Sequence, residues 1–338
     1  MTKPDESDAQ NIIRSALGFL SLSGAPIVVA LSGGPDSMAL CHALSAHAKD
    51  YGISEIHAVI IDHKIRPEST QEAEKVAQTV ASWPHVKPQI ITVSQDFGDT
   101  KIQEQARRYR HDLLKHYCRD TGIHCIFMAH HMDDQAETVL FRLAKGSGLD
   151  GLAGMQMIQD DVASFTDGIG IIRPLLDVPK EILMQYCKDN GIDYVLDPGN
   201  QNDRYARARM RQSWEVLEEE GLTSKRLAKT AMRLARAVDA LEYFTIQSFE
   251  RILRQQTEKS YIFDYEQMCL LPEEIRLRII TGVFSHFDPE SDYGPRTEKI
   301  EALVADLFSG AEFKRRSLGK ALFSLDDNRQ SLIIERAA

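Results

Sequence analysis

The segment at residues 27–37, an apolar run followed by a glycine pair, constrains the fold more than any other stretch of the chain. Its run Ile-Val-Val-Ala-Leu is typical of a strand buried on both faces of a parallel sheet. The two glycines can then adopt positive φ, Pro35 can start a helix, and Asp36 or Ser37 can cap it. Amides at such a corner form an anion site, although an ordinary strand-turn-helix turn remains the alternative.

Strand-like and helix-like segments alternate from Pro26 to about Leu176, and a further helix-like segment follows. This order predicts an α/β fold with a parallel sheet, in which ligands bind beyond the carboxyl ends of the strands. Strands are predicted at residues 27–31, 56–61, 89–93, 123–128 and 169–172, and helices at 37–51, 69–83, 102–121, 134–145 and 180–190.

The remainder of the chain predicts a second, smaller domain. We expect domains at 1–212 and 213–338, the second mainly helical with a hairpin at its end. An apolar stripe at alternating spacings of four and three predicts a long helix with a core-facing side. The stripe comprises Leu227, Ala231, Leu234, Val238 and Leu241, and further helices are predicted at 273–287 and 297–307.

Composition excludes several classes of protein. A chain of 338 residues with 43% hydrophobic residues is not disordered, and no apolar run approaches the ~20 residues of a membrane span, so we expect a soluble, cytoplasmic protein. Five cysteines without Cys-x-x-Cys spacing argue against disulfide, zinc and iron–sulfur sites. The net charge of −10 argues against a nucleic-acid partner, but basic residues cluster at 107–119, 204–211 and 314–320.

Polar residues follow the predicted strands. Asp62 and His63 after the second strand fit either a surface loop or an adenosine or Mg²⁺ contact. After the fourth strand, Asp134 and Glu137 share a helical face, where they form either a catalytic pair or a capping box. A metal site of the adjacent histidines 130 and 131 with Asp133 is disfavoured, because neighbouring residues on a strand point to opposite faces.

Two arginine-rich segments complete the candidate sites. On the predicted helix at 102–121, Arg107 and Arg110 share one face and can reach a common anion. The polar segment 197–211 lacks helical periodicity, which favours contact with a ligand or with RNA phosphates.

The string Ser-Gly-Gly-Pro-Asp-Ser resembles the signature of the PP-loop ATP pyrophosphatases, and the ordered blocks together resemble the tRNA(Ile)-lysidine synthetases. The blocks lie at 32–37, 106–111, 129–138, 173–176 and 197–211. His111, Gly199 and Ala208 depart from the family pattern, which puts single contacts in doubt.

This resemblance implies a PP-loop domain of the adenine nucleotide α-hydrolase type and an ATP-dependent ligase. The family joins lysine to C2 of the wobble cytidine, position 34, of tRNA(Ile) with a CAU anticodon, through an adenylated cytidine that yields AMP, pyrophosphate and lysidine. ATP and Mg²⁺ are the implied cofactors, and tRNA(Ile) and free lysine the implied partners. We expect the second domain to contact tRNA, and the sequence leaves a homodimer open.

The resemblance also implies residue roles. ATP and pyrophosphate would bind Ser32, Gly33, Gly34, Pro35, Asp36, Ser37, Asp62 and His63, with Asp36 also catalytic and holding the metal. Lysine would bind Arg110, Asp134 and Glu137, which are also catalytic candidates, and tRNA would bind Arg204, Arg207 and Arg211. A carboxylate is needed there because a lysine ammonium, with a pKa near ~10.4, must lose a proton before it attacks.

Two alternatives remain from the sequence. One is another PP-loop enzyme that modifies tRNA or forms amides, although paired cysteines and a glutaminase segment are both missing. The other is a non-catalytic nucleotide- or RNA-binding protein, which would bind ATP without releasing pyrophosphate.

Overall fold

The chain divides into two compact units, Met1–Ala235 and Arg236–Ala338, in a computed structural model. The structure describes residues 6–62, 64, 68–93, 102–160, 168–195, 214–288 and 296–337, with the backbone alone for 6–8, 102–108, 160 and 215. The domain boundary that the sequence predicts, between residues 212 and 213, lies outside the described residues and stays a prediction.

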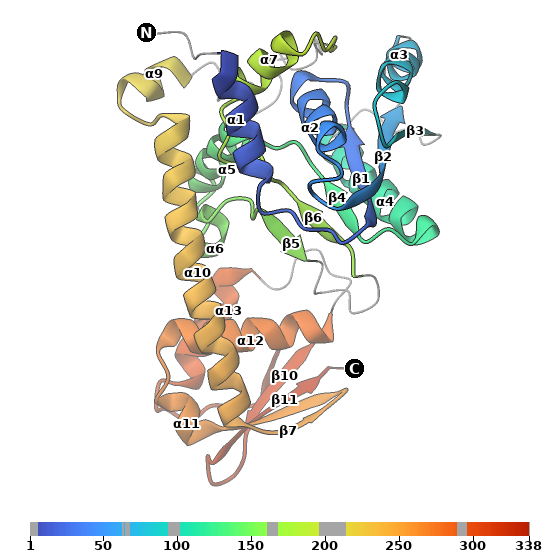
Figure 1. Cartoon of the computed structure of the whole chain (residues 1–338). Helices are drawn as coiled ribbons and strands as arrows, with labels where there is room; N and C mark the ends of the chain where they lie inside the picture. The colour runs from blue at the N-terminus through green and yellow to red at the C-terminus, as the bar shows by residue number, and fades with distance from the viewer. Residues whose placement is uncertain are drawn as a thin grey trace. The chain divides into compact units, whose positions relative to one another are not determined.

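The first unit contains a six-stranded sheet (Figure 1). Its order is β3 (Val86–Thr92), β2 (Ile53–Asp62), β1 (Ala25–Leu31), β4 (Cys125–Phe127), β6 (Gly170–Ile172) and β5 (Ile158–Asp160). All neighbours are parallel except β5 and β6. The chain leaves β1 toward β2 on one side and later returns to β4 on its other side. The carboxyl ends of β1 and β4 therefore form a topological switch point, where ligands bind in such sheets.

Both faces of β1 are buried, as its apolar sequence predicts. Val29 faces a core that α1 (Glu6–Leu17), α2 (Pro35–Ala46), α3 (Ser69–Ala81) and α7 (Lys180–Asp189) share. Val28 faces a second core formed with α4 (Ile102–Thr121). Alternating side chains of one strand thus hold helices on both sides of the sheet.

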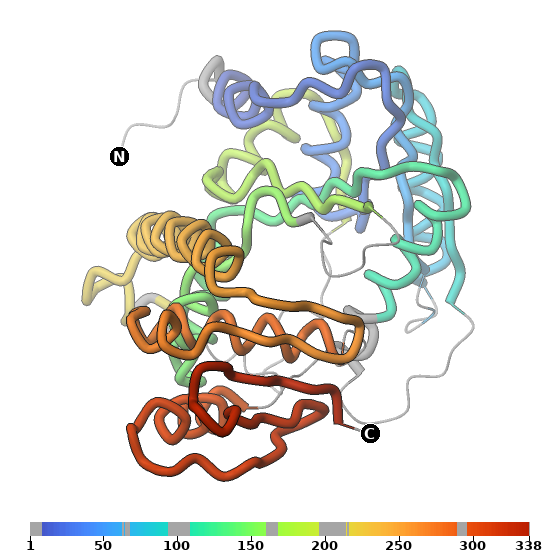
Figure 2. Tube along the Cα trace, turned by 90° about the horizontal axis from the view of Figure 1, so that it is seen from below, coloured from blue at the N-terminus to red at the C-terminus, as the bar shows by residue number. Residues whose placement is uncertain are grey.

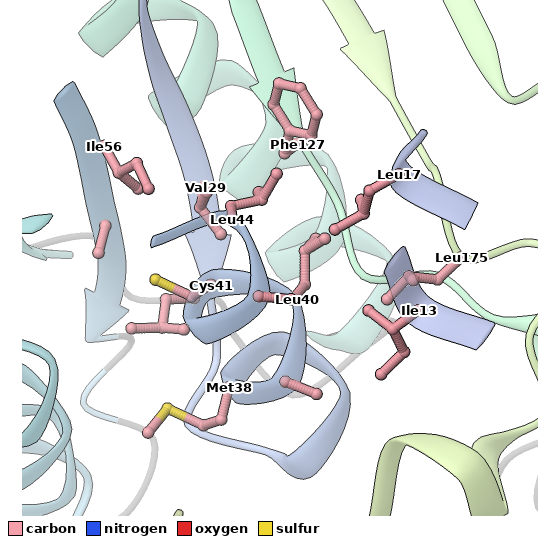
Figure 3. Packing of buried hydrophobic residues seen from close by; sticks show 14 of the residues in the cluster. Ile13, Leu17, Val29, Met38, Leu40, Cys41, Leu44, Ile56, Phe127 and Leu175 are labelled. Carbon is pink, nitrogen blue, oxygen red and sulfur yellow. The ribbon is translucent and has the colours of Figure 1, made fainter. Parts of the chain in front are cut away.

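Packing around α2 fixes the helix that follows the glycine pair. Figure 3 shows Leu40 and Leu44 of α2 beside Val29 and Phe127 of the sheet, with Ile13 of α1 nearby. Nine of the twelve residues of α2 are buried, so this helix is apolar on nearly every side. Its N-terminus, which carries the candidate loop, is therefore anchored to the sheet.

The helix α5 (Met132–Ala144) follows β4 and leads to α6 (Leu149–Leu152). It packs through Val139 and Leu140 against Leu227 and Ala231, which lie near the start of α10 (Ser224–Ile252). The short helix α9 (Trp214–Glu219) completes this small cluster. Residues 224–235 of α10 belong to the first unit and the rest to the second.

The second unit has its own core and a five-stranded antiparallel sheet, traced in orange and red in Figure 2. Phe263, Phe287 and Phe323 are fully buried in that core. The strands, in sheet order, are β7 (Leu253–Thr257), β8 (Ser260–Asp264), β11 (Ser331–Arg336), β10 (Ala321–Leu325) and β9 (Arg316–Leu318). The helices are α11 (Tyr265–Cys269), α12 (Glu273–Phe287) and α13 (Thr297–Leu307), with the first part of the unit taken up by α10.

The predicted fold class is confirmed: a parallel-sheet domain precedes a region with helices and a terminal hairpin. The bounds predicted for α12 and α13 match the structure. The helix α1 and the strands β5, β7, β8 and β9 were not anticipated. In α1, the apolar stripe Ala9, Ile13 and Leu17 stands among polar residues, and the strands are too short for their periodicity to be read.

The described residues contain neither a membrane-spanning helix nor a disulfide. Each helix that the structure describes is too short or too polar to traverse a bilayer. All five cysteines lie within the described residues and none forms a disulfide; Cys41, Cys118 and Cys187 are buried. Burial raises the pKa of the Cys41 thiol to about 12, so this side chain acts as a small apolar group of the core.

We predict that Leu44→Ala lowers the free energy of unfolding by about 2–5 kcal/mol, because the lost side chain leaves a cavity between α2 and the sheet. Leu143→Ala on α5, where the leucine is 55% exposed, is the control and should change the stability by less than about 0.5 kcal/mol. Urea titration of both variants measures the difference. Equal losses would contradict the packing described for α2.

Candidate functional site

The loop between β1 and α2 turns at one glycine. Gly33 has φ +80°, whereas Gly34 is extended, with φ −73°, and forms the N-cap of α2. The positive φ expected of the pair therefore occurs at Gly33 alone. Its carbonyl accepts a hydrogen bond of 2.8 Å from the backbone N–H of Val195, which ties the loop to the segment after α7.

Two serine hydroxyls close this loop. Ser37 Oγ accepts a 3.1 Å hydrogen bond from the N–H of Ser32, lies 3.1 Å from Ser32 Oγ, and donates to the Gly34 carbonyl at 3.1 Å. The expectation that Asp36 or Ser37 caps the helix is wrong, because α2 already begins at Pro35 and both residues lie in its first turn. The described residues supply no side-chain cap for α2, so the N-terminal end of its dipole favours an anionic ligand.

Asp36 points from this first turn toward positive charge. Its Oδ2 lies 3.6 Å from Nε2 of His131 and 3.9 Å from Nζ of Lys180, distances of electrostatic contact rather than of hydrogen bonds. Its Oδ1 is buried, and the described residues offer it no hydrogen-bond partner. Such an oxygen is ready to accept a ligand, because a buried acceptor without a partner is costly.

His131 links both sides of the switch point. Its side chain is only 5% exposed, and its Nε2 lies 3.4 Å from Asp134 Oδ2 as well as 3.6 Å from Asp36 Oδ2. The residue is the N-cap of α5, and Asp134 Oδ2 accepts its backbone N–H at 3.1 Å. Asp134 does take part in a capping box, which the sequence offered as the alternative to a catalytic pair. The other member of the box is His131 at the N-cap, and Glu137 has no part in it.

The charges around His131 set its protonation. Burial lowers the pKa of His131, but the negatively charged carboxylates of Asp133, Asp36 and Asp134 within 3.4–3.6 Å of its ring nitrogens outweigh this effect and raise the pKa to about 9. Its Nδ1 lies 3.2 Å from the amide N and 3.4 Å from Oδ2 of Asp133, so it accepts from the amide when neutral and donates to the carboxylate when protonated. Near neutral pH the protonated, positively charged form prevails.

Asp133 anchors three helices. Its Oδ2 accepts the backbone N–H of Lys180, the first residue of α7, at 3.1 Å, and its Oδ1 accepts the hydroxyl of Ser224, the first residue of α10, at 2.6 Å. Burial raises the pKa of Asp133, whereas hydrogen bonds from His131, Ser224 and Lys180 lower it more strongly, so the net pKa lies well below the usual range. The carboxylate stays ionised at the N-termini of α5, α7 and α10.

Sequence reasoning missed this anchor. The pair at 133–134 signals two carboxylates, but their roles depend on Ser224, which lies 91 residues away. Contrary to the expectation from the sequence, the two adjacent histidines do not lie on a strand, because β4 ends at Phe127 and His131 is the N-cap of α5.

The other candidate residues are placed as follows. Asp62 is buried, and its two oxygens accept hydrogen bonds from the Lys64 N–H at 3.0 Å and the Thr70 hydroxyl at 2.6 Å, so the protein itself already uses this carboxylate. Glu137 is half-buried on α5, on the same face as Asp134, and Arg110 is exposed on α4. Lying outside the described residues are His63, Arg204, Arg207, Arg211 and the side chain of Arg107.

The site fits a divalent cation that is shared with a phosphate ligand. The described residues hold no group of three or more His, Cys, Asp or Glu side chains arranged as a complete metal site. Mg²⁺, however, takes only one or two protein carboxylates and completes its shell with water and phosphate oxygens. The buried Oδ1 of Asp36 is a suitable hard donor beside the loop.

The chain is similar to several known proteins. Residues 3–219 match the family model of the PP-loop domain. The tRNA(Ile)-lysidine synthase of Methylobacterium nodulans is 34% identical over 314 residues, which cover 90% of this chain and 89% of that protein. The tRNA(Ile)-lysidine synthase of Rhodopseudomonas palustris is 35% identical over 308 residues, which cover 89% and 86%.

One solved structure with a similar fold is a U34-tRNA thiolase from Methanococcus maripaludis with its [4Fe-4S] cluster. The TM-score is 0.54 at 17% sequence identity, and the match covers 68% of this chain and 78% of that one. At this identity the likeness shows the fold alone.

We predict that Gly33→Ala costs at least about 1 kcal/mol more stability than Gly34→Ala. An alanine at position 33 would be held at positive φ, and its Cβ would lie 2.7 Å from Val76 Cγ2. An alanine at position 34 would have an ordinary φ, and the atom nearest to its Cβ, Ser32 Oγ, would lie at 3.5 Å. Urea titration compares the two. Val76→Ala costs stability by itself because Val76 is a buried core residue, but it also removes the clash, so the Gly33→Ala/Val76→Ala double variant should lose less stability than the sum of the two single variants. A Gly33→Ala variant as stable as Gly34→Ala would refute the loop geometry.

Proposed function

The chain belongs to the tRNA(Ile)-lysidine synthase family of PP-loop enzymes, and we propose that it uses ATP to ligate lysine to C2 of the wobble cytidine of a tRNA(Ile) with a CAU anticodon. The observation that carries this proposal is the meeting of two loops at the switch point. Asp36 after β1 and Asp134 after β4 lie 3.6 Å and 3.4 Å from the same imidazole nitrogen. The start of α2 and the start of α5 thus approach the same imidazole, which supports the proposal that both contribute to one reaction centre.

In the first step the C2 oxygen of cytosine attacks the α-phosphate of ATP, which forms an adenylated cytidine and releases pyrophosphate. The amides at the start of α2 and the ammonium of Lys180, 44% exposed at 3.9 Å from Asp36, would hold the departing diphosphate. Asp36 would hold Mg²⁺ through its buried Oδ1. When bound, the metal neutralises phosphate charge and orients the leaving group.

In the second step the side-chain amine of lysine displaces AMP from C2. The amine must first lose a proton, so a carboxylate must hold the ammonium and accept it. Asp134 Oδ2 is committed to the backbone N–H of His131. We therefore assign the holding role to Asp134 and proton acceptance to Glu137, one turn along the same helical face. Arg110 is proposed to bind the carboxylate of the lysine substrate.

The remaining partners are proposals that rest on the sequence. Arg204, Arg207 and Arg211 are assigned to tRNA, Asp62 and His63 to ATP, and free lysine is the second substrate. Since tRNA is modified where it is made and used in bacteria such as the relatives above, we place the protein in the cytoplasm. A homodimer stays a prediction.

We predict that the protein, ATP, labelled lysine and tRNA together yield labelled RNA and one AMP per lysine incorporated. Asp36→Asn should reduce both products by at least about 100-fold, because the carboxylate that would hold the metal is lost. Asp189→Asn, at the far end of α7, is the matched control and should leave turnover unchanged. ATP binding without label in RNA would instead support a non-catalytic nucleotide-binding protein.

We predict that Glu137→Gln lowers kcat/KM for lysine by about 10²–10⁴-fold, the usual range for a lost general base, while the Kd for ATP changes less than about twofold. Calorimetric titration with ATP and initial rates at varied lysine separate the two effects. Equal losses in ATP binding and lysine use would mean that Glu137 only supports the start of α5.

A further inference from the structure

The first turns of α10 carry a face of uniform positive charge. The side chains of Lys225, Lys229 and Arg233 are exposed and follow one another at spacings of four residues. At 3.6 residues per turn these three, with the exposed Arg226, lie within an arc of about 100° on the helix surface. We call these four residues the α10 cationic face.

The opposite side of the same turns is buried. Leu227 is 7% exposed and Ala231 is fully buried, and both pack against Val139 and Leu140 of α5. This packing sets the rotation of the helix, so the cationic face is turned away from α5 and toward solvent. Lysine and arginine at these positions are therefore not needed for the core.

The charge of this segment differs from that of the whole chain. Residues 221–235 contain no Asp or Glu, although the chain has 50 acidic and 40 basic residues. A solvated helix face ordinarily mixes both signs in i,i+4 pairs. Within the described part of the chain, no carboxylate forms an ion pair with Lys225, Lys229 or Arg233, while Arg226 donates to the Gly221 carbonyl at 3.0 Å. Such a face is complementary to a polyanion.

The cationic face begins beside the candidate site. Ser224, the residue before Lys225, donates its hydroxyl to Asp133 at 2.6 Å, and Asp133 contacts His131. From Lys225 to Arg233 the face extends about 12 Å along the helix axis, at 1.5 Å per residue. A long polyanion bound there would reach the corner that carries Asp36 and Asp134.

We propose that Lys225, Lys229 and Arg233 bind phosphates of the tRNA substrate and hold the RNA against the catalytic corner. This inference rests on the proposed function and adds a surface to it. The described face offers cations without aromatic side chains at the same positions, so it contacts the sugar–phosphate backbone and not the bases. Its contribution to affinity is electrostatic and falls with salt.

The test compares two triple variants with the same change of charge. In the first, Lys225→Gln, Lys229→Gln and Arg233→Gln are combined; in the control, Lys49→Gln, Lys145→Gln and Lys188→Gln are combined, which are exposed lysines elsewhere in the first unit. Filter binding of an unmodified tRNA(Ile) transcript is measured between about 50 and 200 mM salt. The logarithm of the tRNA association constant decreases as the logarithm of the salt concentration rises, and each phosphate contact contributes about 0.7–0.9 to the steepness of that line. We predict that the line becomes shallower by about 2–3 in the first variant, because three contacts are lost.

The first variant should also raise the KM for tRNA at least about 10-fold while the KM for ATP stays unchanged, and the control should match the native protein. An unchanged salt slope with lysidine still formed would overturn the inference and leave the proposed function standing. Equal weakening in both variants would also overturn it, since net charge alone would then explain the effect. Failure of the native protein to form lysidine would refute the proposed function itself.

Discussion

The rest of the site depends on one buried side chain, the imidazole of His131, which contacts the carboxylates of Asp36, Asp133 and Asp134. A buried ion is costly unless opposite charges and hydrogen bonds surround it. Here the ring of His131 faces Asp36 at the start of α2 and Asp133 at the start of α5, and Asp133 accepts from the first residues of α7 and α10. Four helix N-termini thus meet around a single imidazole and carboxylate.

The three aspartates of this cluster have distinct roles because their oxygens are used differently. Both oxygens of Asp133 accept hydrogen bonds within the protein, so this residue is structural. Asp134 caps α5 through one oxygen. Asp36 keeps a buried oxygen for which the described residues hold no partner, and it stands in the first turn of α2, directly after the glycine loop. The residue with an acceptor still to be satisfied is the one suited to a ligand.

The order of the strands explains why the two motifs meet. Residues 32–37 and 129–138 are far apart in the chain, but β1 and β4 are adjacent and parallel, so the segments after them leave the sheet at the same edge. The packing of α10 on α5 then carries a helix with a cationic face to this edge. Chemistry that acts on a nucleotide within a large RNA needs a small reaction centre and an extended surface, and this unit combines the two.

The sequence by itself determined the features that depend on neighbouring residues: the alternation of strands and helices, the helices α12 and α13, and the glycine turn with Pro35 opening α2. These follow from apolar periodicity and from backbone preferences, which act over a few residues. The pairing of the predicted terminal hairpin with β7, β8 and β9 into one sheet, the use of Asp133 as an anchor and the hydrogen bond from Ser224 were decided only by tertiary structure. A hydrogen bond that spans 91 residues depends on how helices pack, and no local pattern encodes it.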